Sequence, residues 1–478
     1  MVLAVSGNAG AAMDLPRTAE SSADWAAQEF GAVELGDKRR TRRAVKVAAV
    51  MAAHPAASIP AQNQRWADTK ATYRLFDQDD VTFQGVSEPH WRRTRQEASS
   101  RACVLLIQDG SQLDFTRHTS VEGLGFIGDG GGRGLMLHSV LAVDPAVGPK
   151  GEAAVLGLAH QQVWIRRQVP AGETRTQRKA RQTQARVWTQ AVEAVGCLGA
   201  ARCIHVADRE ADNFDFFDAC RRHGAGFLVR AYQDRRAALG HEAEESQGHL
   251  LSLVRQLPAL GHKRLYVRRR PTCQPGWRTL QVAAAPVTLF APWLNDGDAP
   301  PLRCWVVRVW EESTPGHEAI EWVLICSEPV ASLSAALEAA QWYSLRWLIE
   351  EYHKCLKTGC RVEQRQLEDL RALQALIGML AIVAVRLLQL KQQARLDPDR
   401  LAVESVSSEH VRMLSTYWGL PAETLTVYQF WRHVARLGGF LARTGDGEPG
   451  WQTLWQGWQK LDLMTLGATI ERDNQKCG

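Results

Sequence analysis

Three acidic residues, far apart in the chain, are of the type that holds metal ions. Asp109 and Asp208 each follow a short apolar segment that favours a β-strand, 102–107 and 203–207. In open α/β sheets the strand ends are where ligand and metal sites gather, although an Asp at such a place also commonly caps the following turn. Together with Glu350, these carboxylates could bind two Mg²⁺ ions about 3.5–4 Å apart, an arrangement that promotes phosphoryl transfer.

The segment from about 338 to 358 would place Glu350 among cations. If it forms one helix, a single face of roughly 80° carries Tyr343, Arg346, Glu350, Lys354 and Lys357. The opposite face is apolar and suited to burial, since it carries Leu345, Leu348, Ile349, Tyr352 and Leu356. A Glu among cations can also be ordinary pairing on a wet surface. The additional Trp347 near the charged side favours contact with nucleic acid, whose phosphates suit Arg.

The elements around these residues predict an α/β core between helical regions. Residues from about 20 to 98 are helical in pattern, and strands alternate with helices from 102 to 230. A β-rich stretch follows from 231 to about 328, and helical patterns resume at 333. The expected strands are 102–107, 112–116, 134–143, 203–207, 226–230, 265–268, 279–290, 302–309 and 320–326.

A strongly basic stretch lies in the N-terminal helical region. Six of the nine residues from Lys38 to Lys46 are positively charged, including Arg39, Arg40, Arg42 and Arg43. Such a run creates a strong local field that suits a polyanion, but an ordinary solvated helix face has the same composition. The charge alone leaves both interpretations open.

Length and composition exclude several classes of protein. The 478 residues suit about two to four domains, and 45% hydrophobic residues are enough for real cores. The ten Cys include no C-x-x-C pair, which argues against a zinc finger, and a large chain without a secretion signal is not expected to rely on disulfides. The longest apolar stretch, 375–385, is too short to span a bilayer, so we expect a cytoplasmic protein without a membrane partner.

Taken together, these residues resemble the bacterial DDE transposases of insertion sequence family four, whose catalytic core is ribonuclease H-like. The resemblance is carried by the order of the three acids and by the Y-R-E-K signature of that family, Tyr343-x2-Arg346-x3-Glu350-x6-Lys357. It extends over nearly the whole chain, through the basic stretch after residue 37 and through the segments 207–212, 383–390 and 435–440.

The resemblance implies a role for each matching residue. The ligands of two Mg²⁺ ions, or of Mn²⁺ in their place, would be Asp109, Asp208 and Glu350. Trp322 would hold a base flipped out of a DNA hairpin, and Arg230 would contact the DNA backbone. The groups that hold phosphates near the flipped base would be Tyr343, Arg346 and Lys357, and Lys354, on the same predicted face, is expected to contact DNA as well. The element ends would be bound in the N-terminal region by Arg39, Arg40, Arg42, Arg43, Tyr73 and Arg74.

The same resemblance implies a domain order and a set of partners. It predicts an N-terminal helical DNA-end-binding domain (1–98), a ribonuclease H-like catalytic domain (99–375) with a β-rich insertion (about 231–328), and a C-terminal helical dimerisation region (376–478). Such an enzyme would excise an insertion sequence through hairpin intermediates and join its 3′-OH ends to target DNA. The implied partners are double-stranded DNA and a second copy of the chain, in the bacterial cytoplasm at the nucleoid.

A few positions depart from the family pattern or compete for the same role. Glu351 follows Glu350 but would point about 100° away, so Glu350 is the expected ligand. Glu210 and Asp212 lie near the second aspartate and are expected to cap a helix. The segment 231–234 is less basic than the family pattern, which puts DNA contacts there in doubt.

Other functions remain compatible with part of the sequence. A ribonuclease H-like nuclease that cuts without joining would explain the acids, but not the spacing of Trp322 from Tyr343. A regulatory protein that binds ends in inactive mixed dimers would keep the fold without cutting. A glycosidase could also use paired carboxylates, but the cation-rich segment around Glu350 suits phosphate better than sugar.

Overall fold

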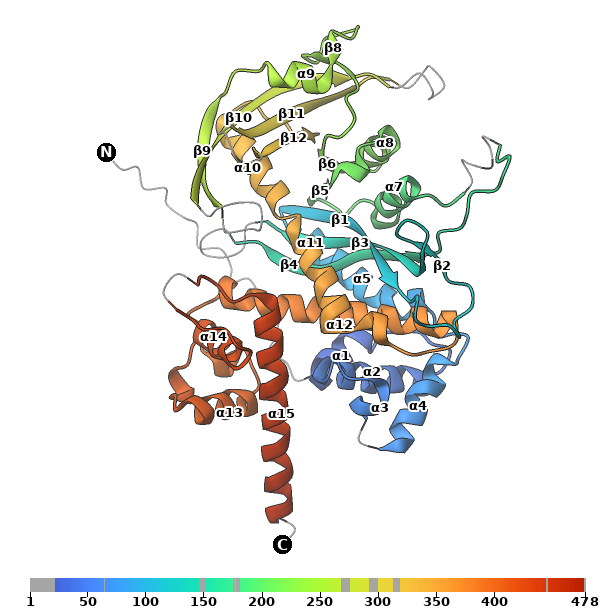
Figure 1. Ribbon diagram of the computed structural model, residues 1–478, viewed down its shortest axis with the longest axis vertical. Helices are drawn as coiled ribbons and strands as arrows, with labels where there is room; N and C mark the ends of the chain where they lie inside the picture. Colours follow the sequence, from blue (N-terminus) through green and yellow to red (C-terminus); the bar gives the residue numbers. More distant parts are fainter. Residues whose placement is uncertain are drawn as a thin grey trace.

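The computed structural model describes residues 22–63, 65–145, 152–174, 177, 181–267, 276–291, 300–312, 319–443 and 446–476. Its N-terminal helices are α1 (Ser22–Phe30), α2 (Lys38–Ala53), α3 (Ile59–Gln62), α4 (Trp66–Phe76) and α5 (Phe83–Ser99). The first four form a compact group, drawn in blue in Figure 1, below a central sheet. The helical region predicted from about 20 to 98 is confirmed, whereas the expectation that no secretion signal starts the chain concerns residues outside the described ranges.

Helix α2 shows how the basic stretch folds. The side chain of Asp37 caps the helix by accepting a hydrogen bond from the Arg39 N–H at 2.7 Å. Residues at helical spacing on one side, among them Ala44, Ala48 and Met51, are fully buried. The cationic side chains therefore lie on the face that points away from the core.

A mixed sheet forms the centre of the molecule. Its inner strand β1 lies between antiparallel β3 and parallel β5, with β4 beyond β3 and β6 parallel to β5. A short β2 pairs with the far side of β3 near its start. These strands are β1 (Cys103–Asp114), β2 (Gly125–Ile127), β3 (Gly132–Asp144), β4 (Ala154–Trp164), β5 (Arg202–Ala207) and β6 (Gly226–Arg230).

Helices cover both faces of this sheet, which explains the unbroken apolar runs in its strands. Val104 and Leu106 of β1 pack in one cluster with residues of α7 (Gln184–Val195), while Leu105 and Ile107 pack in the cluster on the other face. The helices that contribute to this second cluster include α10 (Leu333–Ser344), α11 (Trp347–Lys354) and α12 (Leu370–Leu396).

Strand β1 is longer than the sequence predicts, and this corrects the position of Asp109. The predicted strand ended at Ile107, with a second strand at 112–116, but β1 continues to Asp114 because it stays paired with β3 as far as Gly134. Only the parallel pairing with β5 stops early, at Ile107. Asp109 therefore lies inside a strand, two residues beyond the last parallel pair, and not after a strand end.

The β-rich region continues the same sheet. β12 pairs antiparallel with β6, and the order continues through β11, β10, β7 and β8, with β9 on β10. These elements form the upper part of Figure 1 and comprise β7 (Arg236–Leu239), β8 (Gly248–His249), α9 (Leu250–Arg255), β9 (Gly261–Val267), β10 (Gly276–Leu289), β11 (Leu302–Glu311) and β12 (Glu321–Cys326). The strands expected near 265, 279–290, 302–309 and 320–326 are confirmed, apart from residue 268, which lies outside the described ranges. The sequence did not predict β4, β7, β8 and α9.

The helix predicted from about 338 to 358 is in fact three helical segments. α10 ends at Ser344, α11 begins at Trp347, and a π-helical turn follows at Cys355–Gly359. At the first break the N–H groups of Leu345 and Arg346 donate to carbonyl groups three residues back, each at 3.0 Å. The prediction of one continuous helix with a single charged face was wrong, because the turns tighten at one break and widen at the other.

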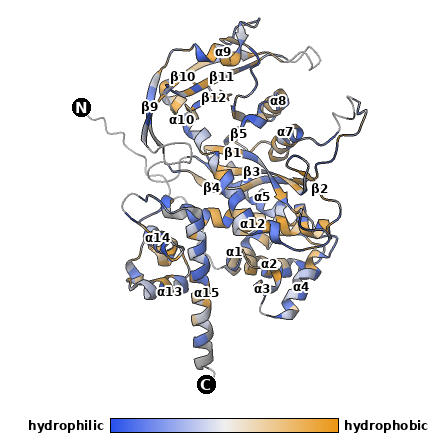
Figure 2. Ribbon diagram, viewed as in Figure 1, coloured by the Kyte–Doolittle hydropathy of each residue, from blue (hydrophilic) through white to orange (hydrophobic). Residues whose placement is uncertain are grey.

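Helix α12 runs through the middle of the protein. It packs against α2, α4, α5 and β4, and also against α14 (Val427–Leu437). Its segment Leu370–Gln392 is long and apolar enough to cross a membrane by length and composition, but 83% of its most apolar window is buried inside the protein (Figure 2). It is a core helix, as predicted. The expected domain boundary between 375 and 376 falls inside α12, and the domain limits stay predictions.

The C-terminal region is helical, as predicted, and consists mainly of α13 (Ser408–Trp418), α14 and α15 (Trp451–Lys476). α14 and α15 cross so closely that only glycine fits. A Cβ at Gly438 would lie 1.8 Å from the Thr453 carbonyl oxygen, and one at Gly457 would lie 1.7 Å from that of Val434. This crossing gives a packing reason for the two-glycine segment 435–440.

One carboxylate joins the N-terminal and C-terminal helices. Asp462 on α15 accepts hydrogen bonds from His54, at the end of α2, and from His410 of α13, both at 3.1 Å. The ring of His410 also stacks on Trp458, with centroids 4.8 Å apart. The hydrogen bond to Asp462 raises the pKa of His54. Burial alone would raise the pKa of Asp462, but the hydrogen bonds from His410 and His54 outweigh it, so this pKa is lowered.

We expect this contact to weaken above neutral pH. Because its folded-state pKa is raised, His54 stabilises the fold fully below its ordinary pKa, and this contribution is lost as the pH rises through the raised value. His54→Gln should therefore lower the melting temperature at pH 6, corresponding to about 1 kcal/mol or less, and have little effect at pH 8. Thermal unfolding at both pH values tests this prediction, and His262→Gln, at an exposed position on β9, is the control. An equal effect of His54→Gln at both pH values would contradict it.

Candidate active site

Asp109 and Asp208 lie on neighbouring strands at the same level of the sheet. β1 and β5 are parallel, with Ile107 opposite Val206, so the same register carried two residues further puts Asp109 opposite Asp208. Neighbouring strands are about 4.8 Å apart and paired residues point to the same face, so the two side chains leave the sheet together. The predicted proximity of the two aspartates is thus built into the strand register.

Glu350, on α11, is linked to Asp109 by Arg346, which bonds to both carboxylates. The guanidinium of Arg346 bonds to both carboxylates, with Nη1 at 3.3 Å from Asp109 Oδ2 and Nη2 on Glu350 Oε1. Within the described ranges no three acidic, His or Cys side chains converge tightly enough to hold a metal ion as they stand. A cation shared by the three acids would require Arg346 to release at least one of its partners.

The electrostatics of Asp109 fit a site for a divalent cation. Burial, together with the neighbouring charges of Asp208 and Glu350, raises the pKa of Asp109 to about 7, although Arg346 opposes the shift. A buried carboxylate beside other carboxylates is an unfavourable arrangement that a cation relieves. The donor set of hard oxygens is the one that Mg²⁺ prefers, so these residues fit the metal.

Both aspartates also bind a nearby backbone N–H, but only Asp208 caps a turn, which is the alternative that the sequence left open. Asp109 Oδ1 accepts the Gly110 N–H at 2.8 Å, and Asp208 Oδ1 accepts the Glu210 N–H at 2.8 Å, which caps a short 3-10 turn, η1 (Arg209–Ala211). Each contact uses one carboxylate oxygen. The capping role and the metal role are therefore compatible for the same side chain.

An aromatic pair stands next to the acids on the same sheet. The rings of Trp322, on β12, and Tyr343, on α10, meet edge to face with centroids 5.3 Å apart. Burial raises the pKa of the Tyr343 hydroxyl, while the guanidinium groups of Arg346 and Arg230 oppose this shift. Arg230 itself donates to the Glu321 carbonyl oxygen at 3.2 Å. Because β12 pairs with β6 and β6 with β5, one continuous sheet positions Trp322 relative to Asp208.

The two lysines predicted beside the acids point elsewhere. Lys354 lies 3.7 Å from Glu351 Oε1, and Glu351 also pairs with Lys391 of α12. Glu351 is thus directed away from Asp109, as the sequence predicted. Lys357, in the π-helical turn, lies 3.6 Å from Glu363 Oε1. The π-helical turn separates Lys357 from Glu350 and explains the different direction of Lys357. Lys354 lies on the same helix as Glu350 but pairs with Glu351.

Glu210 and Asp212 have structural partners. Asp212 is buried, pairs with Arg235, and accepts the N–H groups of Tyr232 and Gln233 at 2.8 and 2.7 Å. It holds the turn after β6. Glu210 bonds to Gln184 of α7. The expectation that the two side chains cap a helix was therefore wrong, since Asn213 caps α8 and both carboxylates bind neighbouring segments.

The N-terminal cations divide into two groups. Arg40 pairs with Asp80 at 2.5 Å and Arg43 with Asp68 at 3.0 Å, so both help to hold α2 against the rest of the N-terminal helices. Arg39 and Arg42 are exposed on α2, as is Arg74 on α4. Tyr73 is half-buried. The exposed group is the better candidate for contact with a polyanion.

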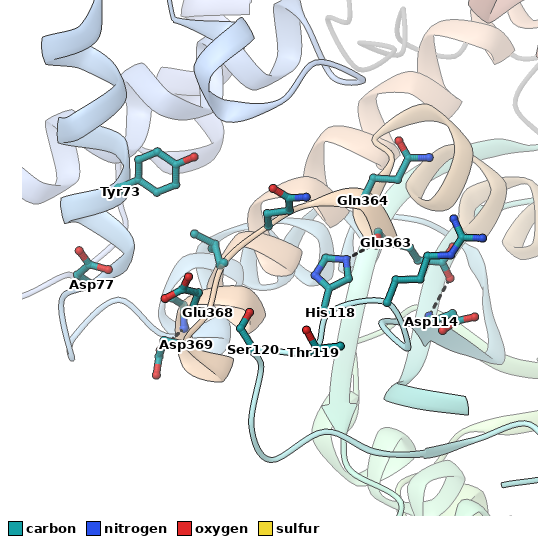
Figure 3. A pocket seen from close by; sticks show the side chains of 14 residues that line it. Tyr73, Asp77, Asp114, His118, Thr119, Ser120, Glu363, Gln364, Glu368 and Asp369 are labelled. Carbon is teal, nitrogen blue, oxygen red and sulfur yellow. Dashed lines mark hydrogen bonds between the residues drawn. The ribbon is translucent and has the colours of Figure 1, made fainter. Parts of the chain in front are cut away.

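A large groove lies apart from Asp109, Asp208 and Glu350. A groove of about 1030 Å³ separates α4 from the segments that follow β1 and precede α12, and Figure 3 shows Tyr73 and Asp77 on one side of it. The rest of the lining is Asp114, Arg117, His118, Thr119, Ser120, Glu363, Gln364, Gln366, Leu367, Glu368, Asp369 and Ala372. Its many carboxylates disfavour a bound phosphate backbone, and we assign it no catalytic role.

The sequence analysis missed a set of buried polar residues next to the site. Ser139 on β3, Gln161 on β4 and His353 on α11 are all buried and hydrogen-bonded to one another in a chain. The signal for this set in the sequence was the presence of single His, Gln and Ser residues inside apolar segments, because buried polar groups need hydrogen-bonding partners. The partners themselves lie too far apart in the chain to be matched from sequence.

Comparison with known proteins agrees with this arrangement. The family described as "Transposase DNA-binding" matches residues 22–81, "Transposase DDE domain" matches 127–386, and "Transposase Tn5 dimerisation domain" matches 383–478. Among solved structures, the chain is similar to a piggyBac transposase synaptic complex with hairpin DNA, at 9% identity and a TM-score of 0.35, over 92% of this chain and 81% of that one. Because the DDE match covers more than half of the 478 residues and lies between DNA-binding and dimerisation families, the chain belongs to the DDE transposases, enzymes that cut DNA and transfer its strands.

Proposed function

We propose that the protein is a cut-and-paste transposase of insertion sequence family four, close to the transposon-five transposase. Three of the Y-R-E-K residues support this, since Arg346 bonds to both Asp109 and Glu350 and lies close to Tyr343. The strand order β4-β3-β1-β5-β6, with only β1, β5 and β6 parallel, supports a ribonuclease H-like core. The proposed domains are 1–98, 99–375 with an insertion at about 231–328, and 376–478.

Three carboxylates would hold the catalytic metal. Asp109, Asp208 and Glu350 are the proposed ligands of two Mg²⁺ ions, for which Mn²⁺ could substitute, and such ions activate the attacking oxygen and stabilise the leaving one. Arg346 and Tyr343 would then bind phosphate oxygens, as guanidinium and hydroxyl groups do well. Lys354 and Lys357 are proposed to turn from Glu351 and Glu363 to the DNA backbone when it binds.

The reaction would proceed through a DNA hairpin. A water oxygen first attacks the phosphorus at the element end and displaces the 3′ oxygen of the element strand. The freed 3′-OH attacks a phosphorus of the opposite strand, which closes the hairpin and displaces a 3′ oxygen of the flanking DNA. A second water attacks the hairpin phosphorus and frees the 3′-OH again. This 3′-OH then attacks a phosphorus of target DNA and displaces a 3′ oxygen of the target strand. Trp322, supported by Tyr343, would stack on the base that is flipped out in the hairpin, and Arg230 would hold the nearby backbone.

The proposed partners follow from the flanking regions. The N-terminal helices would bind the inverted-repeat ends through Arg39, Arg42, Tyr73 and Arg74, with Arg40 and Arg43 mainly holding the helices together. The C-terminal helices would join two copies in a paired-end complex, and the bacterial cytoplasm, at the nucleoid, is the proposed place of action.

The observation that carries this proposal is that Arg346 links Asp109 to Glu350, while Asp208 follows the neighbouring strand and the Trp322–Tyr343 pair lies nearby. The test is incubation with Mg²⁺ and DNA that carries the inverted repeats flanking the coding sequence. We expect nicked, hairpin and strand-transfer products in that order. Cleavage without joined products would instead indicate a nuclease, and end binding without any cleavage would indicate a regulatory protein.

A double substitution on α2 tests how ends are bound. Arg39→Ala with Arg42→Ala should weaken end binding and lower the slope of log affinity against log salt concentration by about 1–2, because each lost phosphate contact removes about 0.9. The same charge change on α8 (Phe214–Arg222), Arg221→Ala with Arg222→Ala, serves as control. Gel-shift titrations over a salt series measure both. An unchanged slope in the α2 variant would place the DNA contact on another surface.

A further inference from the structure

A buried polar layer lies between the sheet and α11. Ser139, on β3, is opposite Asp109 in one register and opposite Gln161, on β4, in the other. Tyr352 and His353, on α11, face these two side chains. The four polar side chains are almost completely buried, with exposed fractions from 0 to 7%. They therefore sit directly beside one proposed metal ligand and on the helix that carries another.

Hydrogen bonds connect the layer from strand to strand to helix. The Gln161 amide donates to Ser139 Oγ at 2.9 Å and to Tyr352 Oη at 2.7 Å, and Ser139 Oγ lies 3.2 Å from His353 Nε2. Burial lowers the pKa of His353 to about 3. The ring is therefore neutral, and the hydrogen bond between its Nε2 and the Ser139 hydroxyl joins β3 to α11.

This series of hydrogen bonds fixes the position and rotation of α11, which the apolar contacts leave free. Leu348 and Ile349 fill the space under α11, but apolar contact has no preferred direction and tolerates a small slide or rotation of a helix. Hydrogen bonds weaken steeply when distance or angle changes. His353 follows Glu350 by three residues, close to one helical turn. A movement of α11 at His353 therefore moves the Glu350 carboxylate as well.

We propose that Ser139, Gln161, Tyr352 and His353 are positioning residues that set the rotation and height of α11, so that Glu350 shares a divalent cation with Asp109 and Asp208. None of them touches the reacting atoms. The inference rests on the proposed metal-dependent reaction and adds the residues that assemble its metal site.

Ser139→Ala is the first test, because it removes one hydroxyl with little change of volume. The Mg²⁺ concentration that gives half-maximal end nicking should rise about tenfold, as for other groups that orient metal ligands, while the rate at saturating Mg²⁺ recovers. Tyr352→Phe, which keeps the ring and removes the bond from Gln161, should shift the midpoint in the same direction. With this second variant, the test remains decisive if one of the two folds poorly.

A binding measurement separates positioning from a general loss of stability. Electron paramagnetic resonance titration of Mn²⁺ onto the complex with end DNA should show weaker Mn²⁺ binding in both variants, by a similar factor. The matched control is Ser415→Ala, another buried serine, which lies on α13 in the C-terminal region. All variants should bind end DNA equally, and the control should leave the Mg²⁺ midpoint unchanged.

Two results would overturn the inference, and they differ in what else they affect. If the wild type nicks DNA with Mg²⁺ but Ser139→Ala and Tyr352→Phe share its midpoint and Mn²⁺ affinity, the positioning role is wrong and the proposed function stands. If the wild type neither binds Mn²⁺ nor requires a divalent cation for nicking, the proposed metal chemistry and the positioning role both fall.

Discussion

Asp208→Asn is expected to abolish DNA cleavage, by more than about a thousandfold, while end binding stays unchanged. Asparagine keeps the oxygen that caps the turn at Glu210, so the fold after β5 is preserved. It removes the negative charge that a shared cation requires. End binding is unaffected because the exposed cations of α2 and α4 lie in a different region of the molecule.

Comparison with Asp208→Ala separates the two roles of this residue. If Asp208 only capped a turn, the asparagine variant would cut normally, and the alanine variant would lose about 1 kcal/mol of stability. If it holds metal, both variants are inactive and only the alanine variant melts earlier. Single-turnover nicking and thermal unfolding measure the two effects, with Asp215→Asn, an exposed acid on α8, as control. An active asparagine variant would remove Asp208 from the catalytic site.

Trp322→Ala should slow hairpin formation about tenfold to a hundredfold and change the first nick much less. The stacking of a base on an aromatic ring is worth about 1–3 kcal/mol, and in the proposed mechanism this stacking is needed only after nicking. Separate rate constants for nicking and for hairpin formation, measured on the same end-bearing duplex, test the prediction. Trp322→Phe should retain most of the activity because it keeps a stacking surface.

The matched control for lost packing is Trp305→Ala. Trp305 is also a half-buried tryptophan of the same sheet, on β11, and its ring meets that of His241 at 5.7 Å. We expect it to lower stability without changing the ratio of the two rate constants. Equal losses of nicking and hairpin formation in Trp322→Ala would assign that residue a packing role.

The parts of the site that follow from local pattern were predictable from sequence. The apolar segment before Asp208 and the buried side of α11, with Leu348 and Ile349, are set by burial, which leaves a periodic trace in the chain. The pattern also placed Trp322 on a strand ahead of Tyr343. The interrupted helix was not predictable, because the tightened turn at Leu345 and the π-helical turn after Lys354 carry no proline or glycine signal at their start.

Partners that come from distant segments were also beyond the sequence. Arg40 and Arg43 are drawn into the fold by acids that follow them by 40 and 25 residues, at Asp80 and Asp68. No periodicity in a sequence encodes such pairs. Arg346 is the clearest example, since its type suggested a phosphate ligand, whereas the structure has it neutralising two carboxylates on different elements.

The course of α12 has a consequence for how this enzyme is inherited and engineered. Because α12 contributes side chains to the N-terminal bundle, the sheet and the C-terminal bundle, one helix packs against all three regions. Gene fusions that exchange one region between relatives would have to keep the surface of α12 matched on all sides. A junction placed within 370–396 would disturb all three regions at once.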